Sequence, residues 1–159
     1  MKHASVAVWL GVLALVVTAC QTGRPSPQAY NLVLNKTTSA SIKVDLIGVS
    51  QIEKHAWEGY DLDQYWAEGD SRRANADKLS VVLPTGQPLV VRKDDPHWQT
   101  WIRNGASELL VIADLPGQFT PGPTDPRRIF IPLDKIAWNV KNDTLEIQVQ
   151  DTLVRPITP

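Results

Sequence analysis

The sequence feature that most constrains the fold is a period of two in the placement of apolar residues. Over residues 41–49, Ile42, Val44 and Leu46 alternate with polar or charged neighbours, and residues 144–149 repeat this alternation. Successive side chains of a β-strand point to opposite faces, so such a segment is typical of a strand with one buried face. The pattern therefore predicts a mainly β chain.

Five further apolar runs share a length of four or five residues and mostly have Pro, Gly, Asn or Asp at their ends. They cover residues 30–34, 79–83, 89–92, 109–113 and 129–133. Seven short strands separated by turn signals favour an antiparallel β-sandwich with Greek-key-like connections. The Pro- and Gly-containing residues 84–88 indicate a hairpin turn between two of these strands.

Two short helices are expected to interrupt the strands. Asp95 can cap a helix that has Pro96 at its first position, and Trp98 and Trp101 follow at helical spacing. The other helix is expected within residues 61–68, where apolar residues share one helical face before a Gly.

A Pro- and Gly-rich connection over residues 116–128 ends in two arginines. Such a segment is either a rigid, shaped loop or a mobile one. Arg127 and Arg128 have the geometry to bind a carboxylate or a phosphate. They can equally close the loop by pairing with Asp125 or Asp114, and we favour that structural role.

Residues 1–19 are typical of a secretory leader. Lys2 and His3 precede an uncharged stretch of 16 residues, which is shorter than the roughly 20 residues that a membrane-spanning helix needs. We therefore expect a removed signal peptide. The polar, Pro-containing residues 20–29 are expected to form a flexible tether, and residues 30–159 the folded domain.

Residues 17–20 read Val-Thr-Ala-Cys and resemble the bacterial lipobox. Small side chains let the peptidase approach the backbone, and only a thiol can carry the thioether-linked diacylglycerol. The resemblance implies cleavage before Cys20, which would then carry a diacylglycerol and an N-acyl chain. Each buried methylene contributes about 0.8 kcal/mol, so the anchor would be firm. Gln21 resembles the pattern of lipoproteins sorted to the outer membrane, with the domain in the periplasm.

Composition excludes several classes of function. A net charge of −1 provides no basic face for nucleic acid, and the single Cys cannot form an internal disulfide or a cysteine zinc site. His55 and His97 lack the spacing of a helical metal-binding pair, so no metal site is expected. The chain has no Gly-x-Ser-x-Gly motif and no phosphate loop, and we expect neither enzymatic activity nor a cofactor.

Large aromatic residues are the main candidates for partner binding. Trp is frequent at the energetic centres of interfaces and also stacks on sugars. Trp side chains can equally seal the ends of a sandwich, and we favour that role for most of them. The candidate contact regions are residues 56–70 and 116–128. The candidate partner-binding residues are Trp57, Tyr60, Tyr65, Trp66, Trp98, Trp101, Arg127 and Arg128.

With its lipobox, tether and sandwich pattern, the chain resembles the outer-membrane lipoproteins of type VI secretion systems. Residues 41–46 are similar to an early strand of that family, and residues 57–66 to its aromatic helical insertion. Residues 109–114 are similar to its hydrophobic strand that ends in Ala, and residues 145–149 to its final strand. The resemblance implies a β-sandwich that docks with another envelope protein.

Two functions are therefore carried forward. The first is a membrane-anchored docking module for an envelope complex, such as a type VI secretion assembly. The alternative is a lipoprotein that binds peptidoglycan or another envelope glycan through exposed Trp residues. Neither the partner nor the oligomeric state follows from the sequence.

Overall fold

The segment with the clearest alternation forms a central strand, β2 (Ile42–Val49), in the computed structural model. The structure describes residues 26–37, 39–134, 137 and 143–158. The leader and Cys20 lie outside these residues. Strand β2 pairs antiparallel with one neighbour on each side.

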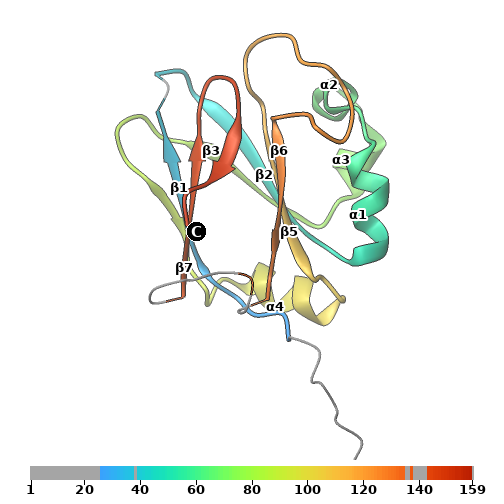
Figure 1. Ribbon diagram of the computed structural model, residues 1–159, viewed down its shortest axis with the longest axis vertical. Coiled ribbons are helices and arrows are strands. Elements are labelled where there is room, and N and C mark those ends of the chain that lie inside the picture. The colour runs from blue at the N-terminus through green and yellow to red at the C-terminus, as the bar shows by residue number, and fades with distance from the viewer. Residues whose placement is uncertain (1–25, 38, 135–136, 138–142, 159) are drawn as a thin grey trace, which may run out of the picture.

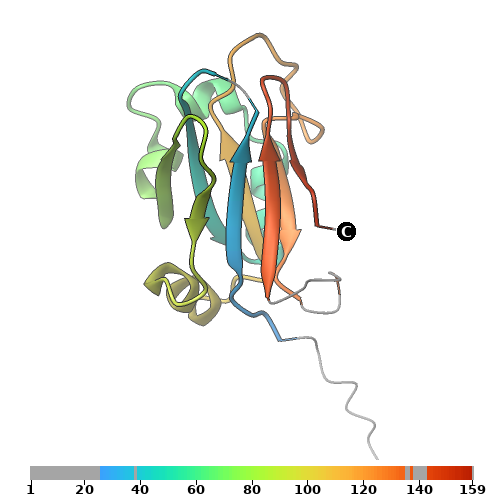
Figure 2. The same cartoon turned by 90° about the vertical axis from the view of Figure 1, so that its left-hand side faces the viewer.

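Within the described residues, eight strands form two four-stranded sheets that pack face to face (Figures 1 and 2). The first sheet has the order β4-β1-β7-β8, and the second has the order β3-β2-β5-β6. The remaining strands are β1 (Asn31–Lys36), β3 (Lys78–Leu83), β4 (Leu89–Val91), β5 (Glu108–Ala113), β6 (Arg128–Pro132), β7 (Thr144–Val149) and β8 (Val154–Pro156). All seven predicted strands are present, and the mainly β sandwich is confirmed.

One strand pairing and one strand differ from the prediction. Strands β1 and β7 run parallel, with Asn31 opposite Thr144 and Lys36 opposite Val149, so the sandwich is not antiparallel throughout. These strands lie far apart in the sequence, and no hairpin fixes their relative direction. Strand β8 was not predicted because its three residues are too few to show a period.

Residues 84–88 do not form the predicted hairpin. They join β3 of the second sheet to β4 of the first sheet, so they carry the chain across the sandwich. The turn itself is present, and Gly86 adopts the positive φ of 76° that favours glycine. A turn signal specifies a bend in the chain, whereas the sheet joined by the following strand depends on tertiary packing.

Four short helices accompany the strands in the described chain: α1 (Gln51–Glu58), α2 (Leu62–Trp66), α3 (Ser71–Asn75) and α4 (Pro96–Arg103). Helices α2 and α4 are the two predicted helices, whereas α1 and α3 were not predicted. Helices α1–α3 cover the outer face of the second sheet, and α4 closes one end of the sandwich (Figure 1).

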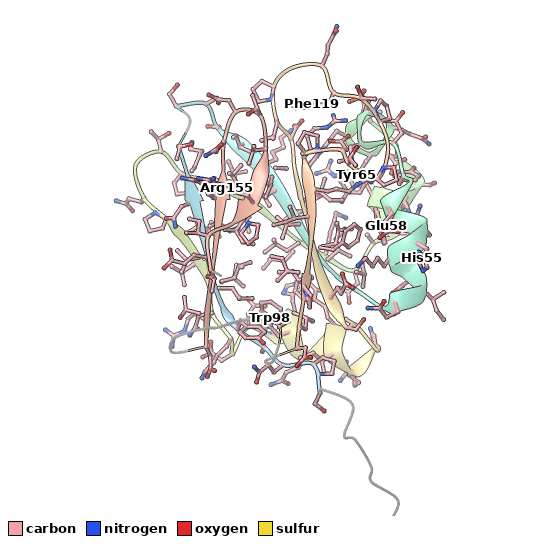
Figure 3. All side chains as sticks on the ribbon, viewed as in Figure 1. His55, Glu58, Tyr65, Trp98, Phe119 and Arg155 are labelled. Carbon is pink, nitrogen blue, oxygen red and sulfur yellow. The ribbon has the colours of Figure 1, made fainter. Side chains whose placement is uncertain are left out.

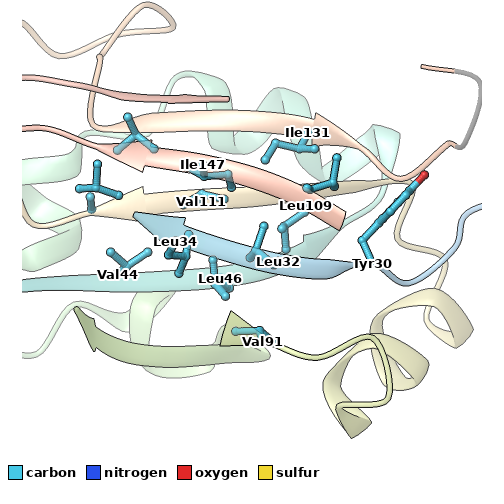
Figure 4. Close-up of a cluster of buried hydrophobic side chains, with 14 of the residues drawn as sticks. Tyr30, Leu32, Leu34, Val44, Leu46, Val91, Leu109, Val111, Ile131 and Ile147 are labelled. Atoms are coloured by element: carbon cyan, nitrogen blue, oxygen red, sulfur yellow. The ribbon is translucent and has the colours of Figure 1, made fainter. Parts of the chain in front are cut away.

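The domain has two apolar cores. The main core lies between the sheets and includes Leu32, Leu46, Val111 and Ile147 (Figure 4). A second core lies beneath helices α1–α3, where outward-facing residues of β2 and β5 meet Trp57 and other helical side chains. The sheet β3-β2-β5-β6 is therefore covered on both faces, and all six residues of β5 are buried.

The two ends of the sandwich are distinct. We call the end that carries α4 the α4 end. There Pro27 forms an isolated bridge with Asp134, and the Gln28 N–H donates to the Leu133 carbonyl at 2.9 Å. The opposite end, which we call the far end, carries residues 84–88, 116–127 and 150–153 (Figures 1 and 2).

Candidate interaction site

We call helices α1–α3 the helical face. Each of these helices begins at a capping side chain, Ser50, Asp61 or Asp70. The Ser50 hydroxyl accepts from the Glu53 N–H at 3.3 Å, and the Glu53 carboxylate accepts from the Ser50 N–H at 2.8 Å. Helices of five to eight residues are unstable alone, so these caps and the second core together hold the helical face.

Aromatic rings form the inner layer of the helical face. Trp57 packs edge-on against Tyr60 and Tyr65, with ring centroids 6.0 and 5.7 Å apart. The Arg72 guanidinium lies 4.5 Å from the Trp57 ring and 4.6 Å from the Tyr60 ring. A cation over an aromatic face is attracted by the negative charge density of the ring. Arg72 therefore stabilises this cluster by lying over both rings.

A buried carboxylate lies beneath these rings. Asp45, on the outer face of β2, is fully buried, and its Oδ2 accepts from the Tyr65 hydroxyl at 2.8 Å and from Arg73 Nε at 2.9 Å. Burial raises the pKa of Tyr65 well above its ordinary value, and the Asp45 charge raises it further. Tyr65 therefore stays protonated as a donor. Arg73 also covers the Trp66 ring at 4.3 Å.

Arg127 holds the loop over residues 116–128 in place. Its Nε and Nη2 donate to the two carboxylate oxygens of Asp125 at 3.0 and 2.7 Å, and both residues are buried. Its Nη1 reaches Asp63 of α2 at 2.5 Å, and its guanidinium lies 4.7 Å from the Phe119 ring. Of the two acceptors predicted for the arginines, Asp125 pairs with Arg127, and the segment is a shaped loop held to the helical face.

Arg128 joins the same loop to α1. Its Nη1 donates to the carbonyls of Trp57 and Tyr60 at 2.6 and 2.8 Å, and its Nη2 donates to the Gly122 carbonyl. Burial lowers the pKa of Arg128. A cation at the C-terminal end of a helix complements the helix dipole, so Arg128 acts as a cap for α1.

The structure separates the candidate partner-binding residues into two groups. Trp98 and Trp101 lie in the main core, whereas the other four aromatic candidates belong to the second core or pack against it. Figure 3 shows Trp98 at the α4 end and Tyr65 beside the helical face. As whole residues, Trp57, Trp98 and Trp101 are at most 6% exposed. Tyr60 and Trp66 are half-buried, and arginine guanidinium groups lie over their rings. A sugar needs an open ring face to stack, so this packing disfavours the glycan-binding alternative.

A cleft of about 530 Å³ opens beside the aromatic cluster. Its lining includes Trp66, Gly69, Arg73 and Lys78. The indole Nε1 of Trp66 is buried and has no hydrogen-bond acceptor within the described part of the chain. Glu68 lies exposed at the same cleft. The cleft thus combines an aromatic edge with charges of both signs, as protein interfaces do.

Several residues of this site were not predicted, namely Asp45, Asp63, Asp70, Arg72 and Arg73. One signal in β2 was available: Ile47 and Val49 are apolar although they face the same side as Asp45. Apolar residues on both faces of a strand indicate that a second layer covers it. The arginines could not have been selected, because their partners lie on elements distant in the sequence.

The described residues contain no group of three or more His, Cys, Asp or Glu side chains that could hold a metal ion. Among the described helices, none has the length and apolar character needed to cross a membrane.

The chain matches no protein-family model and no curated protein. It is similar to the solved structure of Serratia marcescens Lip, a membrane-bound component of the type VI secretion system. The TM-score is 0.51 at 17% identity, over 82% of this chain and 98% of that chain. This chain has the Lip fold. The sandwich that the family resemblance implied is thus confirmed, with its helical additions.

Two further solved chains support the same fold. A chain of a type VI membrane complex aligns with a TM-score of 0.55 at 14% identity, over 82% of this chain and 98% of that chain. A chain of the structure of the T6SS protein TssM C-terminal domain from EAEC aligns with a TM-score of 0.55 at 14% identity. That alignment covers 80% of this chain and 99% of the other.

Proposed function

We propose that this chain is an outer-membrane lipoprotein whose sandwich docks another protein of a type VI secretion membrane complex. The observation that carries the proposal is the shared fold, which extends over nearly the whole length of three chains from type VI secretion structures. The lipobox at residues 17–20 supplies the membrane attachment that such a component requires. The role is non-catalytic.

The helical face and the loop over residues 116–128 are the proposed docking surface. Arg127 and Arg128 hold this loop against α1 and α2, so loop and helices present one preorganised surface. Preorganisation favours binding because little conformational entropy is lost on association. Tyr60, Trp66 and the neighbouring cleft supply the aromatic edges and paired charges from which interfaces are commonly built.

The lipid anchor would assist this docking. A domain attached to a membrane meets a partner in the same envelope at a raised effective concentration, so a modest contact area suffices. We expect metabolic labelling with a clickable fatty acid to modify the full chain but not the Cys20→Ser variant. An equal signal from both proteins would contradict lipidation at Cys20.

The docking surface can be tested by co-purification with the TssM-type protein of the same organism. Tyr60→Ala and Trp66→Ala are expected to weaken capture several-fold while each variant still unfolds in one cooperative thermal transition above the assay temperature. Val90→Ala and Arg155→Ala, on the other sheet, are matched controls that should bind normally. Equal capture by all four variants would contradict this surface, and absence of capture by the unaltered protein would contradict the docking function.

A further inference from the structure

The tether leaves the domain close to the first turn of α1. A series of three backbone hydrogen bonds, each 2.9 Å long, runs from Gln28 to the end of β2. The Gln28 N–H donates to the Leu133 carbonyl, the Leu133 N–H to the Ser107 carbonyl, and the Ser107 N–H to the Val49 carbonyl. Val49 ends β2, and α1 begins two residues later. Residues 26–30 therefore lie at the end of the sandwich that carries α4 and the start of α1 (Figures 1 and 2).

The length of the tether limits how the domain can be turned. The seven residue-to-residue steps from Cys20 to Pro27, where the chain first pairs with the domain, span at most about 25 Å when fully extended. A compact domain of roughly 130 residues has a radius of gyration of about 14 Å, which corresponds to a diameter of about 36 Å. A chain anchored at Cys20 therefore cannot turn its far end toward the bilayer that holds it.

The surface at the α4 end carries an exposed apolar side chain and an exposed cation. Ile52, in the first turn of α1, is 85% exposed and is the most exposed of the large hydrophobic residues that the structure describes. Arg103, in the last turn of α4, is exposed and forms no ion pair with any described residue. Glu53 and Asn104, the neighbours of Ile52 and Arg103, line one cavity of about 230 Å³, which places the two helix ends side by side.

We infer that the α4 end rests on the phospholipid surface, with Ile52 in the apolar boundary and Arg103 among the headgroup phosphates. This orientation rests on the proposed lipidation of Cys20. An exposed apolar side chain can enter the boundary between headgroups and acyl chains, and an arginine can pair with a lipid phosphate. Lipid is the partner inferred here because the tether keeps this end within about 25 Å of the bilayer.

The orientation also explains how docking and anchoring coexist. The α4 end faces the bilayer, so the loop over residues 116–128 at the far end points away from it (Figure 1). A partner that approaches from the other side of the periplasm would meet the loop over residues 116–128 and the helical face first.

The single Cys of the chain makes a direct test possible. Lipidation consumes the Cys20 thiol, so Ile52→Cys and Val82→Cys each introduce one reactive thiol into the lipidated protein. Val82 is a matched control because it is an apolar residue that is 58% exposed. It pairs with Lys43, six residues and about 20 Å along β2 from Val49, toward the far end.

The two lipidated proteins are labelled with an environment-sensitive fluorophore and reconstituted in vesicles of phosphatidylethanolamine and phosphatidylglycerol that contain a doxyl-labelled phospholipid quencher. Quenching at position 52 is expected to exceed that at position 82 several-fold. In the Ile52→Cys background, Arg103→Glu should reduce the quenching, whereas Arg155→Glu on β8 should not. Equal quenching at both positions, or stronger quenching at position 82, would overturn the inferred orientation.

The same samples distinguish this inference from the proposed function. If Cys20 is not lipidated, each variant takes up two fluorophores and does not float with the vesicles, and that result overturns the anchor together with the orientation. One fluorophore per chain and complete flotation, combined with equal quenching at positions 52 and 82, would overturn the orientation alone.

Discussion

Gly48 of β2 lies directly against the side chain of Trp101 of α4, and a Cβ atom on Gly48 would come 2.3 Å from Trp101 Cβ. No real Cβ atom tolerates such a distance, so only glycine permits α4 to close this end of the sandwich. The Trp101 indole continues inward, and its Nε1 donates to the Asp77 carbonyl at 3.0 Å. The contact lets Trp101 enter the main core, where it meets Trp98 edge-on with ring centroids 5.4 Å apart.

We expect Gly48→Ala to lower the free energy of unfolding by about 1–3 kcal/mol, because the added methyl must displace β2 or α4. The measurement is urea denaturation followed by Trp fluorescence. Gly59→Ala is the matched control, since Gly59 has open space around its Cβ position and a φ of −91°. A loss of stability as large at Gly59 would contradict the explanation.

The buried pair of Asp125 and Arg127 should be sensitive to loss of one partner. Asp125→Asn leaves the Arg127 cation without its buried bidentate acceptor, and we expect a loss of about 3 kcal/mol in the free energy of unfolding. Asp63→Asn is the control, because Asp63 contacts the same guanidinium from a side chain that is 63% exposed. The Asp63→Asn variant should lose less than about 1 kcal/mol of unfolding free energy.

A double-mutant cycle separates the pair from its surroundings. Asp125→Asn combined with Arg127→Gln removes both charges, so the double variant should be more stable than the sum of the two single losses indicates. Additive losses would mean that Asp125 and Arg127 contribute independently. In that case the loop would not depend on their pairing.

Stability should vary with pH through Asp95, the cap of α4. Burial pushes the pKa of Asp95 upward, but hydrogen bonds from the His97 N–H and ring outweigh this effect and hold the pKa below its ordinary 3.8. The folded-state pKa is lowered, so the ionised carboxylate stabilises the domain above pH 3.8. That contribution is lost as the pH falls through the folded-state value.

Asp95→Asn keeps a capping oxygen but removes the charge. The difference in unfolding free energy between the parent protein and this variant should be constant above roughly pH 5 and should shrink as the pH falls below 3.8. Urea denaturation at a series of pH values measures it. A difference that does not change with pH would show that the carboxylate charge makes no contribution.

The capping box of α1 gives a further prediction. Ser50→Ala removes the acceptor for the Glu53 N–H, and we expect a loss of about 1 kcal/mol in stability together with faster hydrogen exchange at that amide. Ser71→Ala, at the exposed first position of α3, should have little effect because Asp70 provides that cap. Equal losses at the two serines would contradict the capping role.

The sequence by itself determined seven of the eight strands in the described chain, because the alternation in β2 and β7 and the short apolar runs between turn residues in the other five are local properties. The cap and Pro that begin α4 are equally local. The lipobox prediction also depends on only four adjacent residues, and it stays a prediction. Helix α1 was missed although its capping box, Ser50 and Glu53, is present in the sequence.

Only the tertiary structure decided which strands are neighbours and what each aromatic or charged side chain contacts. The parallel pairing of β1 with β7 joins segments more than 100 residues apart. The pairing of Asp45 with Arg73 and the contact of Arg128 with the Trp57 carbonyl likewise join distant elements. Such contacts depend on the shapes of whole surfaces rather than on local spacing. The same holds for the aromatic residues: their number indicated a possible interface, whereas packing placed most of their rings in the two cores.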